Sequence, residues 1–233
     1  MNPGAPLLRA RLGRASVGCS SAAHGNVGDH VGDDPAAVLA ARARVAEAGS
    51  LPAPDRWVWL RQVHGTAVVV VDAVPAATPE ADAAVTGVAG LALAVVTADC
   101  APIVLATDDA VAVVHAGHRG LAAGVVEAAV DSLRTVGSGE VRAFLGPCIR
   151  PEAYEFGAED LARIVEVLGP TVAARTAAGA PALDVPAAVR AALARADVAP
   201  PVDCGVCTAT DTGFFSHRRD GATGRQVTVA VLT

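Results

Sequence analysis

Three consecutive apolar runs in the middle of the chain constrain its fold more than any other feature. They are LALAVVTADC (Leu91–Cys100), PIVLAT (residues 102–107) and AVAVVHAG (residues 110–117). Each has the length of a β-strand, and apolar residues occupy successive positions instead of alternate ones, which indicates that both faces of the strand are buried. Such strands need other elements to cover them on both sides of their sheet.

Helices and further strands flank these runs. Asp33 or Asp34, followed by Pro35, predicts the start of a helix that Gly49 ends. Further helices are predicted at residues 120–137, 158–168 and 185–196, and further strands at residues 141–149 and 227–233. The β-rich segments 56–65 and 66–73 predict a hairpin that turns at His64–Gly65, and residues 169–184 predict a loop. We therefore expect one α+β domain over residues 1–233, with a mixed sheet covered by helices.

Composition narrows the possible functions. The 233 residues are 52% hydrophobic and carry a net charge of −6 with only 3% aromatic residues, which argues against a nucleic-acid-binding protein. The apolar runs are short and interrupted, so we expect no membrane partner or membrane-spanning helix. Five cysteines, no disulfide-scaffold spacing and no apolar leader at the start predict a cytoplasmic protein.

All 18 basic residues are arginine, and the chain contains no lysine. This excludes a Schiff-base lysine, a pyridoxal-phosphate anchor and a Walker A lysine. Any anion bound by a charged side chain other than histidine must be held by arginine, and backbone N–H groups at a helix start are the alternative.

Three potential metal ligands stand where predicted strands end. His64 ends the segment RQVHG, Cys100 ends TADC, and His115 ends VVHAG. Two imidazoles and one thiolate from three strand ends can build a three-ligand zinc site with an open fourth position. The carboxylates of Asp82 and Asp99 are candidates to orient the histidine rings. On spacing alone, the alternative is that each is an ordinary hydrogen-bonded polar residue.

Two other motifs offer weaker metal hypotheses. His118 follows His115 by three residues and is predicted in the first turn of the next helix, where it lines a pocket without binding metal. The segment CGVC (Cys204–Cys207) has no partner pair for a zinc ribbon and no surrounding βαβ pattern for a thioredoxin-like role. Burial of one or both cysteines is the simpler interpretation.

Seven sequence blocks resemble those of one known family, the YfiH-like or laccase-domain proteins, also called polyphenol oxidases or peptidoglycan editing factors. The blocks are GDHVGDDPAAV, QVHG, ADAAVT, TADCAP, VVHAGHRGL, LGPCI and FFSHRRDGATGRQ, which span Gly28 to Gln226 in family order. The resemblance places the family's three metal ligands on His64, Cys100 and His115, which we take as the catalytic centre. This chain departs from the family where His118 replaces the usual tryptophan and where its N-terminal loop is shorter.

The resemblance implies a YfiH-like fold and a zinc-dependent purine nucleoside enzyme. Such enzymes use phosphate to cleave adenosine, inosine or 5′-methylthioadenosine, and they also deaminate adenosine. Zinc chemistry of this kind is known from nucleobase deaminases. The candidate substrate-binding residues are Asn26, Arg42, His118, Arg119, Phe215, His217, Arg218 and Arg219. The arginines are candidates for phosphate, Phe214 or Phe215 for stacking on the purine, and His217 for protonating the leaving base.

Three alternatives remain open at this stage. A copper phenol oxidase would use the same two histidines and one cysteine, but its axial ligand is often methionine, and the only methionine is Met1. Adventitious copper in a zinc site would account for weak oxidation. A hydrolase that edits peptidoglycan precursors would use Cys100 as nucleophile with His115 as base, or a zinc-bound water. A non-catalytic binding protein would have lost a ligand, whereas all three are present.

Overall fold

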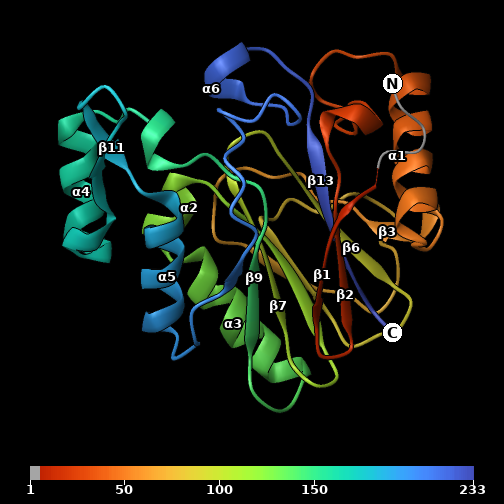
Figure 1. Ribbon diagram of the computed structural model, residues 1–233. Helices are drawn as coiled ribbons and strands as arrows, with labels where there is room; N and C mark the ends of the chain where they lie inside the picture. The colour runs from red at the N-terminus through yellow and green to blue at the C-terminus, as the bar shows by residue number, and fades with distance from the viewer. Residues whose placement is uncertain (1–5) are drawn as a thin grey trace.

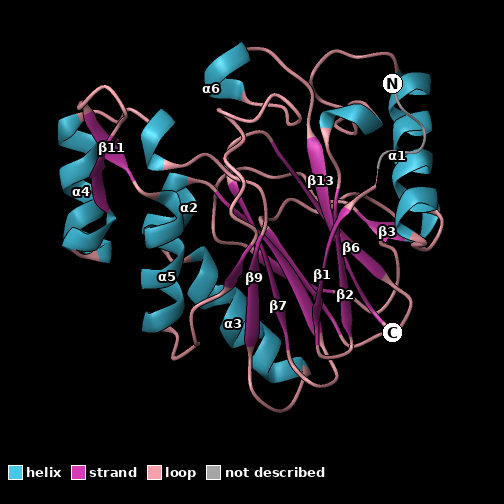
Figure 2. Ribbon diagram, in the orientation of Figure 1, coloured by secondary structure: helices cyan, strands magenta, loops and turns pink. Residues whose placement is uncertain are grey.

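The computed structural model describes residues 6–233 as two β-sheets that pack face to face between helices (Figures 1 and 2). The five-stranded sheet has the order β1 (Leu8–Leu12), β2 (Ala15–Cys19), β13 (Gln226–Leu232), β6 (Ala92–Thr97), β3 (Trp57–Val58). The six-stranded sheet has the order β12 (Val202–Asp203), β9 (Arg142–Leu145), β7 (Ala101–Ala106), β8 (Val111–Ala116), β5 (Ala83–Thr86), β4 (Val68–Val70). A separate hairpin joins β10 (Ala173–Arg175) to β11 (Pro181–Leu183).

Helices cover the outer faces of both sheets (Figure 2). On the five-stranded sheet lies α1 (Pro35–Gly49), and on the six-stranded sheet lie α2 (His118–Ala123), α3 (Val125–Val136) and α5 (Val185–Arg195). Farther from the sheet, α4 (Ala158–Leu168) packs against α2, α5 and β11. The short α6 (His217–Asp220) lies apart from both helical layers. Four 3₁₀ turns complete the secondary structure: Ala22–His24, Pro54–Arg56, Pro151–Ala153 and Pro170–Val172.

The layers explain why the central strands are apolar at every position. On β6, Leu93 and Val95 pack between the two sheets, while the alternating Ala94 and Val96 pack toward α1. Both faces of the strand are therefore buried, as the sequence predicts. The α+β architecture is confirmed. The expected mixed sheet is divided into two main sheets, because the chain turns from β6 in one sheet to β7 in the other.

The predicted helices are present, with one difference. The carboxylate of Asp34 accepts the Ala36 N–H at 3.0 Å, and Pro35 begins α1, so the predicted start is correct. The long helix predicted at residues 120–137 is divided in two, because Gly124 adopts a φ of 96° between α2 and α3. His118 is the first residue of α2, as expected.

The hairpin predicted at residues 56–73 is wrong. Trp57 on β3 pairs in parallel with Ala92 of the five-stranded sheet, whereas Val68 on β4 pairs in parallel with Ala83 of the six-stranded sheet. The segment between them crosses from one sheet to the other, and His64 lies in its turn with a φ of 60°. The loop predicted at residues 169–184 is also partly wrong, because it contains β10 and β11.

The state of the cysteines and the character of the helices can also be compared with the sequence-based expectations. All five cysteines are free thiols; in the CGVC segment Cys204 is half-buried and Cys207 is buried. Within residues 6–233, no helix has both the length and the apolar character required to cross a bilayer.

Candidate metal and active site

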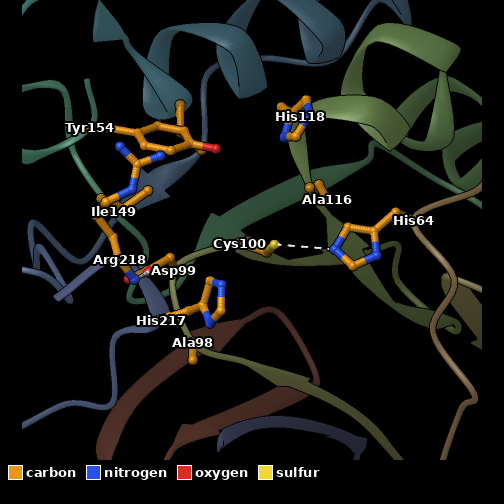
Figure 3. A pocket seen from close by; sticks show the side chains of 12 residues that line it. His64, Ala98, Asp99, Cys100, Ala116, His118, Ile149, Tyr154, His217 and Arg218 are labelled. Carbon is orange, nitrogen blue, oxygen red and sulfur yellow. Dashed lines mark hydrogen bonds between the residues drawn. The ribbon is translucent and has the colours of Figure 1, made fainter. Parts of the chain in front are cut away.

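Three potential ligands converge where the two sheets meet. His64 lies in the turn after β3, Cys100 in the turn that leads from β6 to β7, and His115 near the end of β8. Their ligand atoms all lie within 4.8 Å of one another, and Nε2 of His64 lies 3.8 Å from Sγ of Cys100 (Figure 3). The three residues singled out in the sequence are therefore neighbours in space, although His64 lies in the segment between β3 and β4 and not at the end of a strand as predicted.

One buried carboxylate holds both histidines. Oδ1 of Asp82 lies 2.8 Å from Nδ1 of His115 and also accepts the backbone N–H of His64 at 2.9 Å. Oδ2 accepts the backbone N–H groups of Val63 and Gly65. Because a carboxylate accepts, Nδ1 of His115 carries a proton, and Nε2 is the nitrogen that can bind a metal once it has lost its own proton. The sequence-based role of Asp82 in orienting a ring is confirmed.

The same expectation does not hold for Asp99. This buried residue has a φ of 104°, and its carboxylate accepts the Thr208 hydroxyl at 2.6 Å and the Arg218 backbone N–H at 2.7 Å. Both oxygens are used to tie residues 208 and 218 to the turn that carries Cys100. Asp99 thus holds the wall of the site instead of a histidine ring, and its unusual backbone conformation lies directly beside a candidate ligand.

A close approach of the backbone at Gly117 completes the geometry. A Cβ atom at this position would lie 2.6 Å from Cδ2 of His64 and 3.3 Å from Sγ of Cys100. These distances are too short for any side chain, so the position requires glycine although its φ of −74° is ordinary. The ring of His64 occupies the space that the missing side chain leaves.

The electrostatics of the site favour a thiolate beside imidazoles. Burial acts to raise the pKa of Cys100, but His115 and His64 outweigh it and lower that pKa to about 6. Burial likewise acts to lower the pKa of His115, but Cys100 and Asp82 raise it to about 9. A thiolate is the form of cysteine that binds metal.

These residues fit a single metal ion. Two imidazole nitrogens and a thiolate are ligands that both zinc and copper accept. In the part of the chain that the structure describes, this is the one group of three or more His, Cys, Asp or Glu donors gathered so closely. His118 stands outside it, as the sequence predicts.

Two cavities meet at this group. The smaller, of about 180 Å³, is lined by His64, Cys100, Asp99, Tyr154 and other residues from α2 and α6. The larger, of about 680 Å³, lies toward the five-stranded sheet and α1. Four residues line both cavities, namely His64, Ala98, Cys100 and His217. The potential metal site therefore forms part of a wall that the two cavities share.

Four of the predicted substrate-binding residues line these cavities. His118 and Arg218 line the smaller cavity, Arg42 lines the larger, and His217 lines both. The ring of His118 packs edge-on against Phe156 at a centroid distance of 5.2 Å. The guanidinium of Arg218 lies over the Tyr154 ring at 4.7 Å (Figure 3).

The other four predicted residues line neither cavity. The Arg219 guanidinium bonds to Asp220 and to loop carbonyls, so its donors are occupied. Asn26 uses its amide to hold Gly28 and the backbone N–H of Arg225. Phe215 packs against Gly224, and Arg119 is exposed. Their substrate-binding roles remain predictions that the cavities do not support.

Three residues in the cavity walls were not among the candidates predicted from the sequence. Trp59 lies under the guanidinium of Arg42 at 3.9 Å in the wall of the larger cavity. Tyr154 lines the smaller cavity and Arg225 the larger. Signals were present, since Tyr154 is the only tyrosine and Arg225 lies in the GATGRQ block, but neither residue ends an apolar run.

The chain is similar in sequence to a known family and to named proteins from other organisms. Residues 9–233 match the family described as multi-copper polyphenol oxidoreductase laccase. A Streptomyces coelicolor protein named purine nucleoside phosphorylase is 45% identical over 206 residues, which cover 86% of this chain and 84% of that protein. A Mycobacterium tuberculosis protein named purine nucleoside phosphorylase is 44% identical over 213 residues, covering 86% of this chain and 81% of that protein.

Solved structures agree in fold over almost the full chain. The crystal structure of a Neisseria meningitidis protein superposes with a TM-score of 0.86 at 32% identity, covering 98% of this chain and 99% of that one. The crystal structure of YlmD from Geobacillus stearothermophilus superposes with a TM-score of 0.85 at 30% identity, covering 100% of this chain and 94% of that one.

Proposed function

This chain belongs to the family described as multi-copper polyphenol oxidoreductase laccase, and we propose that it acts as a metal-dependent purine nucleoside phosphorylase. The observation that carries this proposal is the convergence of two imidazoles and one thiolate beside two adjoining cavities, with His64 and Cys100 in the wall that both cavities share. The two adjoining cavities provide room for two reactants beside the same group, as a phosphorolysis requires. Relatives that cover most of the chain and are named purine nucleoside phosphorylase support the choice of substrate class.

Zinc is the metal that we assign to His64, Cys100 and His115. A bound divalent ion would supply Lewis-acid polarisation of a substrate oxygen. The site offers only three protein ligands, which is typical of a catalytic zinc site with an open position. A multi-copper centre would need further histidines, and no second group of metal-binding side chains is gathered within residues 6–233. Copper in this site would be an adventitious occupant.

The residues around the site suit cleavage of an N-glycosidic bond by phosphate. In that reaction the bond from ribose C1′ to the purine breaks, a bond from C1′ to a phosphate oxygen forms, and the leaving purine takes up a proton. His217 lines both cavities, and its Nδ1–H donates to the carbonyl of Gly221 at 2.8 Å. Its Nε2 is then the ring nitrogen that exchanges a proton with the reactants.

Arg218 and Arg42 take part in binding the nucleoside under this proposal. Arg218 is held over Tyr154 in the smaller cavity, and Arg42 is held over Trp59 in the larger. Fixed guanidinium groups donate to ribose and purine acceptors without losing much further freedom. We propose adenosine, inosine and 5′-methylthioadenosine as substrates, with deamination of adenosine as a second reaction of the same site.

A cysteine hydrolase is the second candidate, and one observation favours it. Asp82 orients His115, and His115 in turn lowers the pKa of Cys100, which is the order of groups in a Cys–His–Asp arrangement. His64 argues for the metal instead. A nucleophilic cysteine needs one imidazole as its base, whereas here a second imidazole, that of His64, lies 3.8 Å from the same sulfur.

Removing the metal separates the two candidates. The protein is treated with a chelator, dialysed, and assayed with inosine and phosphate before and after zinc is restored. We expect activity to disappear with the metal and to return with stoichiometric zinc. A Cys–His hydrolase would retain its activity after chelation, so full activity of the metal-free protein would overturn the zinc assignment.

A further inference from the structure

Two residues with unused hydrogen-bonding groups, Thr97 and Arg225, line the larger cavity. Thr97 is the last residue of β6, and the register pairs it with Gln226, the first residue of β13. Arg225 immediately precedes Gln226, so the pairing brings Arg225 and Thr97 to the same end of two adjacent strands. Both line the larger cavity together with Cys100 and His115.

Among residues 6–233, the hydroxyl of Thr97 has no hydrogen-bond partner. The residue is 2% exposed, and its Oγ1 is buried without a hydrogen bond to any of the described residues. A buried hydroxyl that stays unpaired is unfavourable, because it has lost its bonds to water and gained none in return. A ligand that accepts a hydrogen bond from this position would remove the penalty.

The guanidinium of Arg225 is only partly used. Nη1 donates to the carbonyls of Thr223 and Gly224 at 2.8 and 3.1 Å, which leaves Nε and Nη2 without a hydrogen-bond partner among residues 6–233. Burial lowers the pKa of Arg225, while the nearby Cys100 and Asp99 raise it. A half-buried cation with free donors and no carboxylate partner is suited to an anion.

The other arginines in the wall of this cavity each form an ion pair with a carboxylate. Arg42 forms an ion pair with Asp29 at 3.2 Å and lies over Trp59. Arg61 forms an ion pair with Glu80. Arg225 is thus the arginine of this cavity that forms no ion pair with a carboxylate within the described chain.

We propose that Arg225 and Thr97 form an oxyanion subsite in the larger cavity, and that this subsite holds the phosphate of the reaction. The inference rests on the proposed function for the identity of the oxyanion. The ligand is inorganic phosphate in the direction of cleavage, or the phosphoryl group of a pentose 1-phosphate in the reverse direction. A tetrahedral oxyanion accepts from the Arg225 fork and from the Thr97 hydroxyl at the same time.

Phosphate binding by the zinc-loaded protein tests the subsite without relying on catalysis. Inorganic phosphate is titrated calorimetrically into the wild type and into Arg225→Gln, Thr97→Val and Arg61→Gln, with the zinc content of each measured. Thr97→Val keeps the shape of the side chain and replaces the hydroxyl by a methyl group. Arg61→Gln is the matched control, since it removes one charge from the same cavity wall at a paired position.

We expect Arg225→Gln to raise the phosphate Kd about tenfold or more, and Thr97→Val about threefold or more. Arg61→Gln should leave the Kd within about twofold of the wild type. Ribose 1-phosphate should show the same losses in the same variants, because its phosphoryl group occupies the same position. With inosine as substrate, the KM for phosphate should rise while the KM for inosine stays unchanged.

Two results would overturn the subsite. One is a phosphate Kd that is unchanged in both Arg225→Gln and Thr97→Val, and the other is an equal loss in the Arg61→Gln control. The proposed function fails separately: if no purine nucleoside is cleaved in the presence of phosphate, but phosphate binding still depends on Arg225 and Thr97, then the subsite stands and the phosphorylase assignment falls.

Discussion

Oδ1 of Asp82 lies 2.8 Å from Nδ1 of His115, and the same carboxylate accepts the backbone N–H groups of the turn that carries His64. One buried side chain therefore fixes the proton position of one candidate ligand and the backbone position of another. The geometry of the metal site depends on this single carboxylate.

Replacement of Asp82 by asparagine tests that dependence. An amide NH₂ cannot accept, so at least one of the N–H groups now bound by Asp82 would lose its partner. We expect zinc affinity to fall about 10–100-fold, as for other groups that orient a histidine ligand. Chelator competition with a colorimetric indicator measures the affinity. Asp109→Asn is the control, because Asp109 bonds Ser138 in an exposed turn, and its zinc affinity should equal that of the wild type.

A methyl group at Gly117 should displace His64. The added Cβ would lie 2.6 Å from Cδ2 of the His64 ring, which must then leave its position beside Cys100. We expect Gly117→Ala to lose stoichiometric zinc while its far-UV circular dichroism stays native. Gly157→Ala serves as the comparison, since its φ is −58° and the nearest atom to its Cβ is 3.9 Å away. Equal zinc content in the two variants would show that His64 is not held as described.

Much of this site could be predicted from the sequence because it rests on local signals. Cys100 and His115 stand at the ends of apolar strands, which bring their side chains to a common edge, whereas His64 lies in the turn between β3 and β4. The roles of Asp99 and Arg225 could not be found this way. Asp99 is adjacent to Cys100 in the chain, but its partners Thr208 and Arg218 lie more than a hundred residues away. Arg225 is brought to the end of β6 only by the register between β13 and β6, which no local sequence pattern shows.

The fold shows the same division between local and long-range information. Helix caps such as Asp34 and Pro35 act within a few residues, and the corresponding helix start was predicted correctly. The hairpin at His64 was mispredicted because the local sequence shows a turn and two β-rich segments but does not show that these segments pair with different sheets. The choice of partner strand is set by burial of Trp57 against the α1 side of the five-stranded sheet, which no local pattern reports.

Thiol reactivity in the metal-free protein should single out Cys100. Its pKa of about 6 makes it a thiolate at pH 7, whereas burial raises the pKa of Cys19 to about 12 and that of Cys148 well above the ordinary value. Iodoacetamide should label Cys100 first, and the rate should fall as the pH drops below about 6, where the thiolate is protonated. Mass spectrometry of the digested protein locates the label. Restoring zinc should protect Cys100, and labelling that zinc leaves unchanged would argue against a Cys100–metal bond.

His118 should influence substrate preference without holding the metal. It lines the smaller cavity as the first residue of α2, with its ring against Phe156 and outside the group of potential ligands. A larger indole would fill part of that cavity. We expect His118→Trp to keep its zinc and to change the ratio of kcat/KM among inosine, adenosine and 5′-methylthioadenosine. Steady-state kinetics on the three nucleosides provide the ratios, and loss of zinc would show that His118 is a ligand after all.

The products formed from inosine test the central claim most directly. The purified zinc-loaded protein is incubated with inosine, with and without phosphate, and hypoxanthine and sugar products are separated by chromatography. The same assay uses Cys100→Ala and, as a matched control, Cys204→Ala, whose half-buried thiol lies outside the metal-binding group. We predict hypoxanthine and ribose 1-phosphate in equal amounts, only with phosphate present, from the wild type and Cys204→Ala but not from Cys100→Ala. Free ribose formed without phosphate, or full activity in Cys100→Ala, would contradict the account.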